Sequence, residues 1–288
     1  MLRKLILLVC LSGILSNGYS QDTDSLTFAK SKWLKKSIGS KSKLITQHFK
    51  EKKLFGSSQN ISYIEVKNKK QGGFLAVGQE IKRLRTTSSF GKSYNALAAI
   101  NGTFFDVKNG GSVDFVKVKD SVTAINRLDG SGTRSAHQKA AITIKNGFLS
   151  VKKWDGSADW ESMLNDDEVM VSGPLLMIDG VNELLDSGSF SITRHPRSAI
   201  GISGNKVILL TVDGRHENSA GMNLFELTRI MKLLGCSAVI NLDGGGSTTL
   251  WVNDENGNGV INYPSDNKKW DHHGERNVAN VILLKKKP

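Results

Sequence analysis

Asn241-Leu-Asp-Gly-Gly-Gly-Ser-Thr-Thr249 carries the densest signal in this 288-residue chain. The three glycines lie between two apolar segments, 237–242 and 247–252, and each of these segments predicts a β-strand. Consecutive glycines are costly, because glycine loses more backbone entropy on folding than any other residue. Such a run is typical of a place where the backbone must approach another group closely. We therefore predict a strand, a glycine-rich turn and a second strand.

The same turn is the first candidate for a binding site. A glycine-rich turn can present successive N–H groups as an anion-binding concavity, and neighbouring hydroxyls add further donors. Asp243 stands at the entrance and is a candidate catalytic carboxylate; a tight turn capped by this aspartate is the competing interpretation. The segment is not a P-loop, because it lacks the lysine, and its spacing does not match a dinucleotide fingerprint. The predicted anion-binding residues are Gly244, Gly245, Gly246, Ser247 and Thr248.

Charged residues cluster in a predicted hairpin that precedes this turn. Residues 199–203 and 206–212 form two strand-like runs, and Arg197 stands just before the first of them. Asp213 and Arg215 follow the second run, so the hairpin would bring them close to Arg197. The planar fork of arginine suits a phosphate or a carboxylate. We predict that Arg197 and Arg215 bind phosphate and that Asp213 is a second candidate carboxylate. A structural salt bridge is the alternative.

One helix is predicted between the hairpin and the glycine turn. Apolar residues recur at helical spacing from Leu224 to Leu234, and Gly235 can end the helix. Glu226 lies on this helix and is a third candidate catalytic carboxylate. It could instead pair with Arg229, three residues further along the same helix.

Short strand-like runs dominate the rest of the domain. Asn146-Gly147 separates two of these runs and is typical of a type I′ hairpin turn. With 29 glycines and 4 prolines, the pattern predicts an α+β (mixed α/β) class: a single sheet-rich domain with a few helices. Asn101, at the end of one run, either contacts substrate or caps the strand backbone. The remaining predicted strands are 61–66, 96–100, 140–144, 148–151 and 277–284.

The N-terminus predicts export. Residues 1–4 are basic, residues 5–15 are almost wholly apolar, and small or polar residues follow up to Ser20, which is the order of a secretory signal. The apolar run is shorter than the roughly 20 residues that span a bilayer. We expect residues 1–20 to be a signal peptide and the mature protein to be secreted or periplasmic. No later stretch is apolar enough for stable membrane insertion.

The formal charge of +12 is concentrated near the N-terminus. Residues 22–92 contain 16 Lys and Arg against 5 Asp and Glu, whereas residues 93–288 have a net charge of −1. We interpret residues 21–53 as a basic arm that leads into a domain at 54–288. The arm could attract an anionic polymer or envelope surface, or it could be a merely solvated face. The chain has no zinc-finger spacing and no RNA-binding signature, so we expect no nucleic-acid partner.

Six motifs, taken in order, resemble the phosphodiester glycosidase family over roughly residues 54–284. The resemblance implies the family fold and hydrolysis of a sugar-1-phosphodiester, with a substrate similar to an N-acetylglucosamine-1-phosphodiester. The motifs are Ala99-Ile-Asn-Gly-Thr-Phe-Phe105, Arg197-Ser-Ala-Ile-Gly201, Val212-Asp-Gly-Arg215, Asn223-Leu-Phe-Glu-Leu227, Asn241-Leu-Asp-Gly-Gly-Gly-Ser-Thr248 and Arg276-Asn-Val-Ala-Asn280.

A phosphodiester leaves as a stable anion, so clamping of the phosphate and positioning of the sugar should dominate catalysis. An aspartate would activate water or stabilise an oxocarbenium-like centre. We expect no cofactor and no metal, because no metal-ligand spacing is present. The expected partner is a phosphorylated glycan or sugar-phosphate diester. Two alternatives stay open: a non-catalytic envelope glycan- or polyanion-binding module, and a phosphodiesterase that cleaves the P–O bond.

Overall fold

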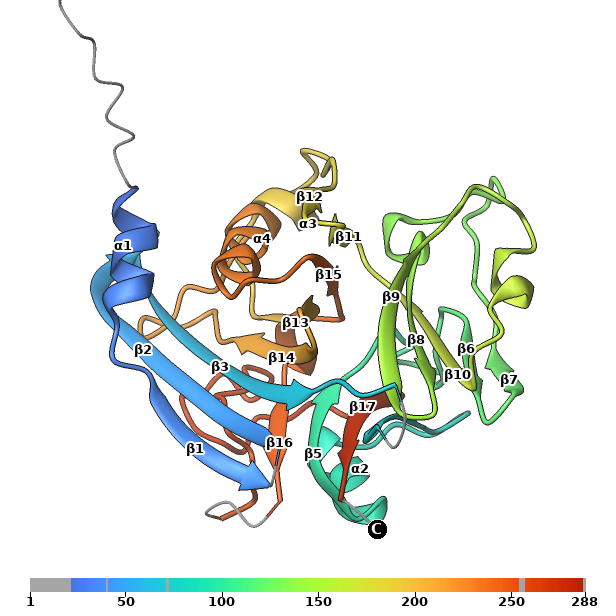
Figure 1. Ribbon diagram of the computed structural model, residues 1–288, viewed down its shortest axis with the longest axis horizontal. Helices are drawn as coiled ribbons and strands as arrows, with labels where there is room; N and C mark the ends of the chain where they lie inside the picture. Colours follow the sequence, from blue (N-terminus) through green and yellow to red (C-terminus); the bar gives the residue numbers. More distant parts are fainter. Residues whose placement is uncertain (1–21, 40, 71–72, 254–256, 287–288) are drawn as a thin grey trace, which may run out of the picture.

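The computed structural model describes residues 22–39, 41–70, 73–253 and 257–286. Its strands form three antiparallel sheets that pack around one another (Figure 1). The largest sheet has eight strands. Their order is β1 (Leu34–Gly39), β2 (Ser42–Leu54), β3 (Ser57–Lys67), β14 (Lys206–Val212), β13 (Arg197–Ser203), β15 (Ala238–Asn241), β11 (Leu175–Ile178) and β12 (Val181–Asn182).

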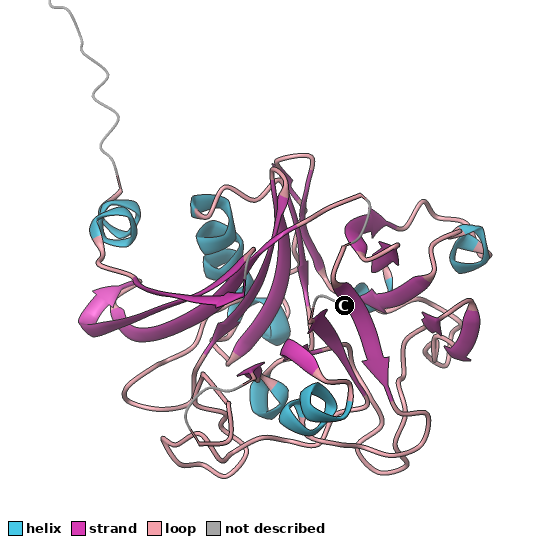
Figure 2. Cartoon of the chain, turned by 60° about the horizontal axis from the view of Figure 1, so that its bottom comes forward, coloured by secondary structure: helices cyan, strands magenta, loops and turns pink. Residues whose placement is uncertain are grey.

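Two smaller sheets complete the architecture, and the helices lie around them (Figure 2). The five-stranded sheet has the order β7 (Ser121–Ala124), β6 (Val116–Val118), β10 (Glu168–Ser172), β8 (Ala140–Lys145) and β9 (Phe148–Lys153). The four-stranded sheet has the order β16 (Leu250–Val252), β5 (Ala96–Asn101), β17 (Asn280–Lys285) and β4 (Leu75–Gln79). The α-helices are α1 (Thr23–Lys30), α2 (Thr87–Ser93), α3 (Ser189–Ile192) and α4 (Leu224–Leu233).

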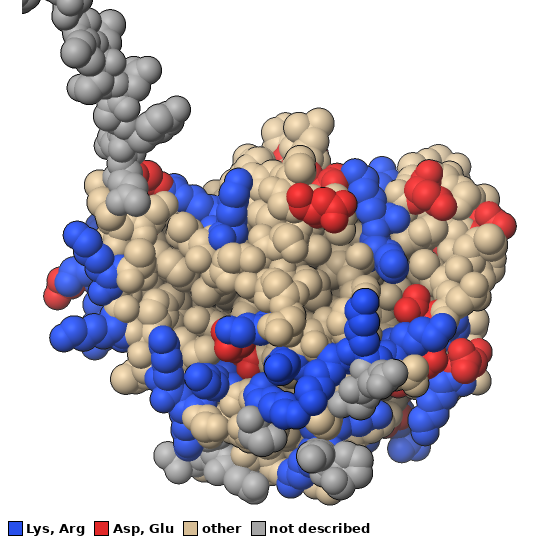
Figure 3. Space-filling model, viewed as in Figure 1, with Lys and Arg blue, Asp and Glu red and all other residues tan. Residues whose placement is uncertain are grey.

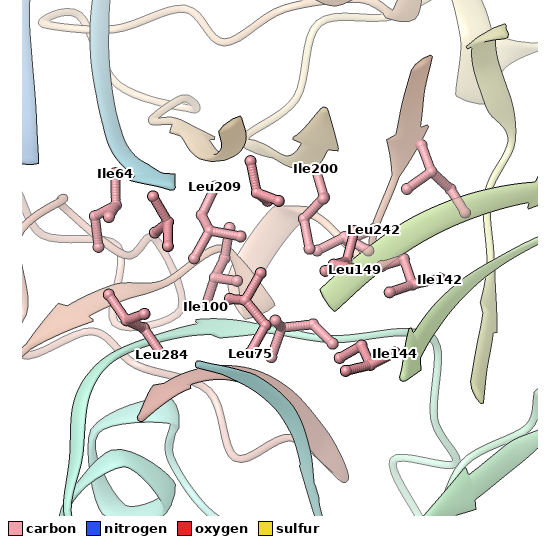
Figure 4. Packing of buried hydrophobic residues seen from close by; sticks show 14 of the residues in the cluster. Ile64, Leu75, Ile100, Ile142, Ile144, Leu149, Ile200, Leu209, Leu242 and Leu284 are labelled. Carbon is pink, nitrogen blue, oxygen red and sulfur yellow. The ribbon is translucent and has the colours of Figure 1, made fainter. Parts of the chain in front are cut away.

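The main core forms where the inner faces of the three sheets meet (Figure 4). Leu209 comes from the large sheet, Ile100 from the four-stranded sheet and Ile142 from the five-stranded sheet, and all three are fully buried. Burial of aliphatic side chains of this size stabilises a fold by about 1.5–3 kcal/mol each. The three sheets therefore form one cooperative unit, and residues at their junction are held rigidly.

Helices cover the outer faces of two sheets. The apolar stripe of α4 packs on the outer face of the large sheet, with Leu227 and Ile230 fully buried. Asn223 begins this helix by accepting a hydrogen bond from the Glu226 N–H, and Gly235 follows its end with φ of +76°. Phe90 of α2 packs beside Trp251 on the four-stranded sheet.

In the described part of the chain, no helix has both the length and the apolar character needed to cross a membrane.

The predicted local elements are largely confirmed. The hairpin around Asn146-Gly147 joins β8 to β9, with φ of +51° and +74° at the two turn residues. The other predicted hairpin joins β13 to β14 in a continuous register. The coarse fold prediction also holds, since the domain is sheet-rich with a few helices, although β-structure dominates it strongly.

The N-terminal region differs from the expected arm. Residues 34–39 and 42–54 form β1 and β2, and β2 pairs with β3 along most of its length. The expected domain start at residue 54 thus falls at the last residue of a strand of the large sheet. Phe28 of α1 is buried against Trp33 and Phe49, which ties the helix to the same sheet. Strand β2 joins the sheet because its N-terminal part is apolar on both faces: Leu44 is buried in the main core, and Ile45 and Phe49 are buried in the cluster that includes Phe28. The predicted signal peptide, 1–20, lies outside the described residues.

Candidate functional site

The glycine turn connects two different sheets. β15 of the large sheet ends at Asn241, and β16 of the four-stranded sheet begins at Leu250, so residues 242–249 cross the junction. Asn101 fixes this crossing. Its Nδ2 donates to the Asp243 carbonyl at 2.7 Å, and its Oδ1 accepts from the Thr249 N–H at 3.1 Å and from the Ser198 hydroxyl at 2.6 Å. Because Asn101 is fully buried, the structure makes it a scaffold residue of the turn and leaves none of its surface for a substrate.

The three glycines permit close approach by other groups. A Cβ on Gly244 would stand 2.7 Å from the Pro196 carbonyl oxygen. A Cβ on Gly245 would stand 2.9 Å from Nη2 of Arg215, and Gly245 also has φ of +59°. A Cβ on Gly246 would stand 2.6 Å from Nη2 of Arg276. Two guanidinium groups therefore lie directly over the bare backbone of the turn.

Most of the backbone N–H groups that the sequence offered as anion donors are paired within the protein. The Gly244 N–H donates to Asp243 Oδ1 at 2.9 Å, and the Gly245 N–H donates to the Pro196 carbonyl at 2.9 Å. The N–H groups of Ser247 and Thr248 close a 3₁₀ turn. In a 3₁₀ turn each N–H donates to the carbonyl three residues earlier, so these two donors are paired inside the turn itself. In the described structure only the Gly246 N–H of this set has no acceptor, so side-chain cations must supply most of the positive potential.

Asp243 stands at the mouth of the turn, between these cations and the sheet junction. Burial raises the pKa of its carboxyl to about 6, while the Ser247 hydroxyl, the Gly244 N–H and the positive charge of Arg276 act in the opposite direction. The side chain keeps some contact with solvent. A carboxylate with a pKa close to neutrality can both take up and release a proton, which suits a general base or acid.

The turn borders a cationic pocket of about 250 Å³. Arg276 pairs with Asp266, with Nε 3.0 Å from Oδ1. Arg215, in contrast, is exposed, has φ of +62°, and has no carboxylate partner within the part of the chain that the structure describes. A non-glycine residue in this left-handed region is uncommon and often marks a functional position. Arg215 is thus an exposed cation that lies over the turn, and its binding of phosphate stays a prediction. The cations that line the pocket are Arg215, Lys268, Lys269 and Arg276.

Aromatic rings form a second wall of this pocket. Tyr263 and Trp270 stack with centroids 4.1 Å apart and planes 4° from parallel, and His216 stacks on Trp270 at 4.9 Å. Such a stack orders the loop that carries Lys268, Lys269 and Arg276. The wall therefore positions cations that are distant in sequence from the glycine turn.

Arg197 lies close to this cluster but is turned into the protein. Its Nε donates to the Met222 carbonyl at 2.9 Å, and its Nη2 donates to the carbonyls of Phe190 and Thr193. Only 1% of the residue is exposed, and burial together with the charge of Arg215 lowers its pKa to about 10. The geometry does not support the predicted phosphate contact. These carbonyls converge on the Arg197 guanidinium for two reasons. Helix α3 and the residue after it carry 190–193, and the antiparallel bridge between His195 and Met222 holds Met222 on the same side of β13.

Asp213 is also held in a hydrogen-bond network inside the protein. Its carboxylate accepts hydrogen bonds from Asn60 Nδ2 at 2.8 Å, Asn262 Nδ2 at 2.9 Å and the Tyr263 N–H at 2.9 Å. It is 1% exposed, and burial raises its pKa against the effect of these donors. Asp213 therefore joins β3, the end of β14 and the loop with the aromatic wall. Its two oxygens are already engaged, so the geometry favours Asp243 over Asp213 as the working carboxylate.

Glu226 is paired elsewhere. Its carboxylate accepts hydrogen bonds from Nε and Nη2 of Arg194, and it also accepts one from the Asn223 N–H in a capping box. The predicted alternative partner, Arg229, pairs instead with Asp22 and Asp24 near α1. The helical spacing predicted an ion pair for Glu226 within its own helix, but the partner in the structure is Arg194, which comes from the segment before β13. The geometry gives Glu226 a helix-capping role.

Sequence reasoning missed a histidine–aspartate pair on the other side of the turn. His137 Nδ1 lies 3.0 Å from Asp114, which is fully buried and also accepts from the Thr103 hydroxyl at 2.8 Å. Thr103 follows Gly102, whose carbonyl accepts the Asp243 N–H at 3.1 Å. An imidazole oriented by a buried carboxylate is a common proton-transfer group. Neither residue lies at a recognisable spacing, so only the fold could reveal the pair.

Arg276 and Asp266 were also missed as site residues. Arg276 is the first residue of the last of the six family-like motifs, and this motif is the sequence feature that could have identified it as a site residue. Among the residues that the structure describes, no group of three or more His, Cys, Asp and Glu side chains is placed to hold a metal ion. The closeness of Arg215 and Arg276 to the glycine turn, together with the raised pKa of Asp243, supports anion clamping next to a titratable carboxylate.

The chain matches one protein-family model and is similar to several known proteins. A family model described as phosphodiester glycosidase matches residues 94–285 and so covers the turn, the hairpin and the closing motif. This match confirms the predicted resemblance. A curated relative, an uncharacterized protein derived from the SPbeta prophage of Bacillus subtilis, is 27% identical over 198 residues. The match covers 59% of this chain and 30% of the relative, so the chain spans less than a third of that protein.

Two solved structures share the fold. A hypothetical protein from Synechocystis superposes with a TM-score of 0.64 at 16% identity, over 88% of this chain and 63% of that one. The catalytic domain of zebrafish N-acetylglucosamine-1-phosphodiester alpha-N-acetylglucosaminidase, auto-inhibited by its pro-peptide, superposes with a TM-score of 0.63 at 18% identity. That match covers 92% of this chain and 94% of the zebrafish domain. At such identities the likeness concerns the fold.

Proposed function

The chain belongs to the phosphodiester glycosidase family, and we propose that it hydrolyses the glycosidic bond between a sugar and a phosphodiester. One observation carries the proposal: the exposed guanidinium of Arg215 and that of Arg276 lie over the three-glycine turn, beside Asp243. Arginine forks bind phosphate oxygens through two parallel hydrogen bonds. Here they would hold the phosphodiester with the Gly246 N–H as a third donor.

The reaction follows from these positions. Water attacks C1 of the sugar, the C1–O bond breaks, and its electron pair stays on the phosphate oxygen, where the arginines stabilise it. Asp243 accepts the proton that the water loses, for which it must be ionised. Donors that are fixed before reaction stabilise developing charge without further reorganisation. The substrate would be a sugar-1-phosphodiester, such as one with N-acetylglucosamine, carried on a glycan.

The bond that breaks is testable with isotopic water. In H₂¹⁸O, cleavage of the C1–O bond places ¹⁸O on the sugar, whereas cleavage of a P–O bond places it on phosphate. We expect label on the reducing sugar and an unlabelled phosphomonoester. Label on the phosphate would contradict the glycosidase proposal and support the phosphodiesterase alternative. Absence of turnover on a panel of sugar-1-phosphodiesters, with ligand binding retained, would favour the non-catalytic alternative.

The phosphate role is tested by a matched pair of substitutions. Arg215→Lys keeps the charge and loses the fork, so kcat/KM should fall about 10- to 150-fold, because charge-assisted hydrogen bonds contribute roughly 1.5–3 kcal/mol each. Arg197→Lys serves as the control. Its main effect should be a lower Tm, since its donors hold backbone carbonyls. Equal kcat/KM for wild type and Arg215→Lys would refute the phosphate role.

We also propose that the protein is exported, because residues 1–20 have the order of a secretory signal. N-terminal sequencing of extracellular or periplasmic material is expected to begin near residues 19–22. Recovery of that material with Met1 intact would contradict cleavage of a signal peptide.

A further inference from the structure

A groove lined by lysines lies at the other end of the large sheet from the glycine turn. Two hollows of about 320 and about 200 Å³ adjoin, because Gly39, Lys41 and Ser42 line both. Glu65 is the one carboxylate in their lining, and it pairs with Lys206 at 2.9 Å. We call the hollows and their six lysines the lysine groove. These lysines are Lys41, Lys43, Lys67, Lys206, Lys285 and Lys286.

The groove is distinct from the candidate active site. Strand β14 begins at Lys206 in the groove and ends at Val212, just before Asp213 and Arg215. At about 3.3 Å per residue, this strand separates the two regions by about 20 Å. Lys41, Lys43 and Lys67 also precede residue 94, where the family match begins. Two of the six lysines, Lys41 and Lys43, come from the basic segment 21–53 that the sequence placed before the family-like domain.

Two of the lysines lie side by side on interior strands. Lys67 of β3 and Lys206 of β14 stand directly opposite each other in the strand register, where like charges repel. The ion pair of Lys206 with Glu65 compensates one of these two charges. Lysines often protect the edge of a sheet from aggregation. That role can explain lysines on the edge strand β1, but β3 and β14 are interior strands. Figure 3 shows Lys and Arg side chains as a band across the lower part of the face drawn in Figure 1.

We propose that the lysine groove binds an anionic polymer with repeating phosphodiester groups. The lysines are spread along an open groove and do not converge on one point, so their charge fits a chain of anions better than a single ion. A polymer longer than about 20 Å could occupy the groove and the active site together, which would raise its apparent affinity. The identity of the polymer rests on the proposed function; the binding itself does not.

Long-chain inorganic polyphosphate is the probe, and its binding to the full protein is measured by calorimetry at low and moderate salt. The test variant is the double substitution K67Q/K206Q, and the matched control is K152Q/K232Q, which removes two exposed lysines on β9 and α4. Each lysine near an anionic surface contributes about five-fold to binding. We expect K67Q/K206Q to bind about 25-fold more weakly, with a shallower salt dependence, and the control to bind like wild type.

Three results would overturn the proposal. The first is equal affinity of both double variants for polyphosphate. The second is competition by inorganic phosphate at equal phosphate concentration, which would indicate a single-ion site. The third is loss of binding to phosphatidylglycerol vesicles by K67Q/K206Q while its polyphosphate affinity stays unchanged, which would indicate a membrane surface. Hydrolysis of a small sugar-1-phosphodiester should be unchanged in K67Q/K206Q. Failure of the proposed function would appear as no hydrolysis by wild type, independently of polymer binding.

Discussion

Replacing Asp243 with Asn is expected to stabilise the folded protein at neutral pH and to lower its turnover. Burial raises the pKa of this carboxyl from its usual 3.8 to about 6. The folded state therefore binds this proton more tightly than the unfolded state does. Stability is highest below pH 3.8, falls as the pH rises towards 6, and stays reduced above it. The difference between the two pKa values corresponds to about 3 kcal/mol at pH 7.5.

Asparagine has nearly the same shape and no charge, so the substitution removes this cost. A chain of this size shifts its Tm by about 2–4 °C per kcal/mol, which gives a rise of about 6–12 °C at pH 7.5. We expect the lower end of that range, because Asp243 keeps some contact with solvent. At pH 4 the rise should be only about 1–2 °C, since most of the carboxyl is then protonated in the folded state. Scanning calorimetry at the two pH values measures both quantities.

Turnover is the second readout for the same variant. If Asp243 is the base, kcat of the wild type rises as the pH passes through about 6, and Asp243→Asn lowers kcat by about 10²–10⁴-fold. Asp271→Asn is the control, because neighbouring donors lower the pKa of Asp271 and its loss brings no gain in Tm. A Tm gain that is the same at pH 4 and 7.5 would refute the electrostatic argument. Wild-type kcat in Asp243→Asn would refute the role as base.

Other substitutions separate structural from catalytic roles. Asp213→Ala removes the acceptor of three hydrogen bonds, and calorimetry should show that the free energy of unfolding falls by about 3 kcal/mol or more. Glu226→Gln weakens the Arg194 pair and should lower Tm while kcat/KM stays within two-fold of wild type. His137→Gln should stay folded with a kcat reduced more than ten-fold if the pair with Asp114 transfers a proton; His273→Gln is the matched control. Activity should persist in EDTA, and a loss reversed by one divalent ion would contradict the metal-free prediction.

The sequence by itself determined the elements whose signals are local. Alternating apolar residues predicted β13 and β14, Asn146-Gly147 predicted the β8–β9 turn, and the stripe from Leu224 predicted α4. These predictions succeed because periodicity and turn chemistry depend on neighbours along the chain. The run of three glycines likewise indicated that other groups approach the backbone closely, although it could not say which groups they are.

Only the tertiary structure decided the role of each charged side chain. Arg197 and Arg215 are both arginines near one hairpin, yet backbone carbonyls surround the first and solvent surrounds the second. Arg276 reaches the glycine turn because the Tyr263–Trp270 stack and the loop around it fold back over the sheet junction. The basic N-terminal region is part of the large sheet because β2 pairs with β3 and buries Leu44, Ile45 and Phe49. Such outcomes depend on burial and on contacts between distant segments, and no pattern along the chain encodes them.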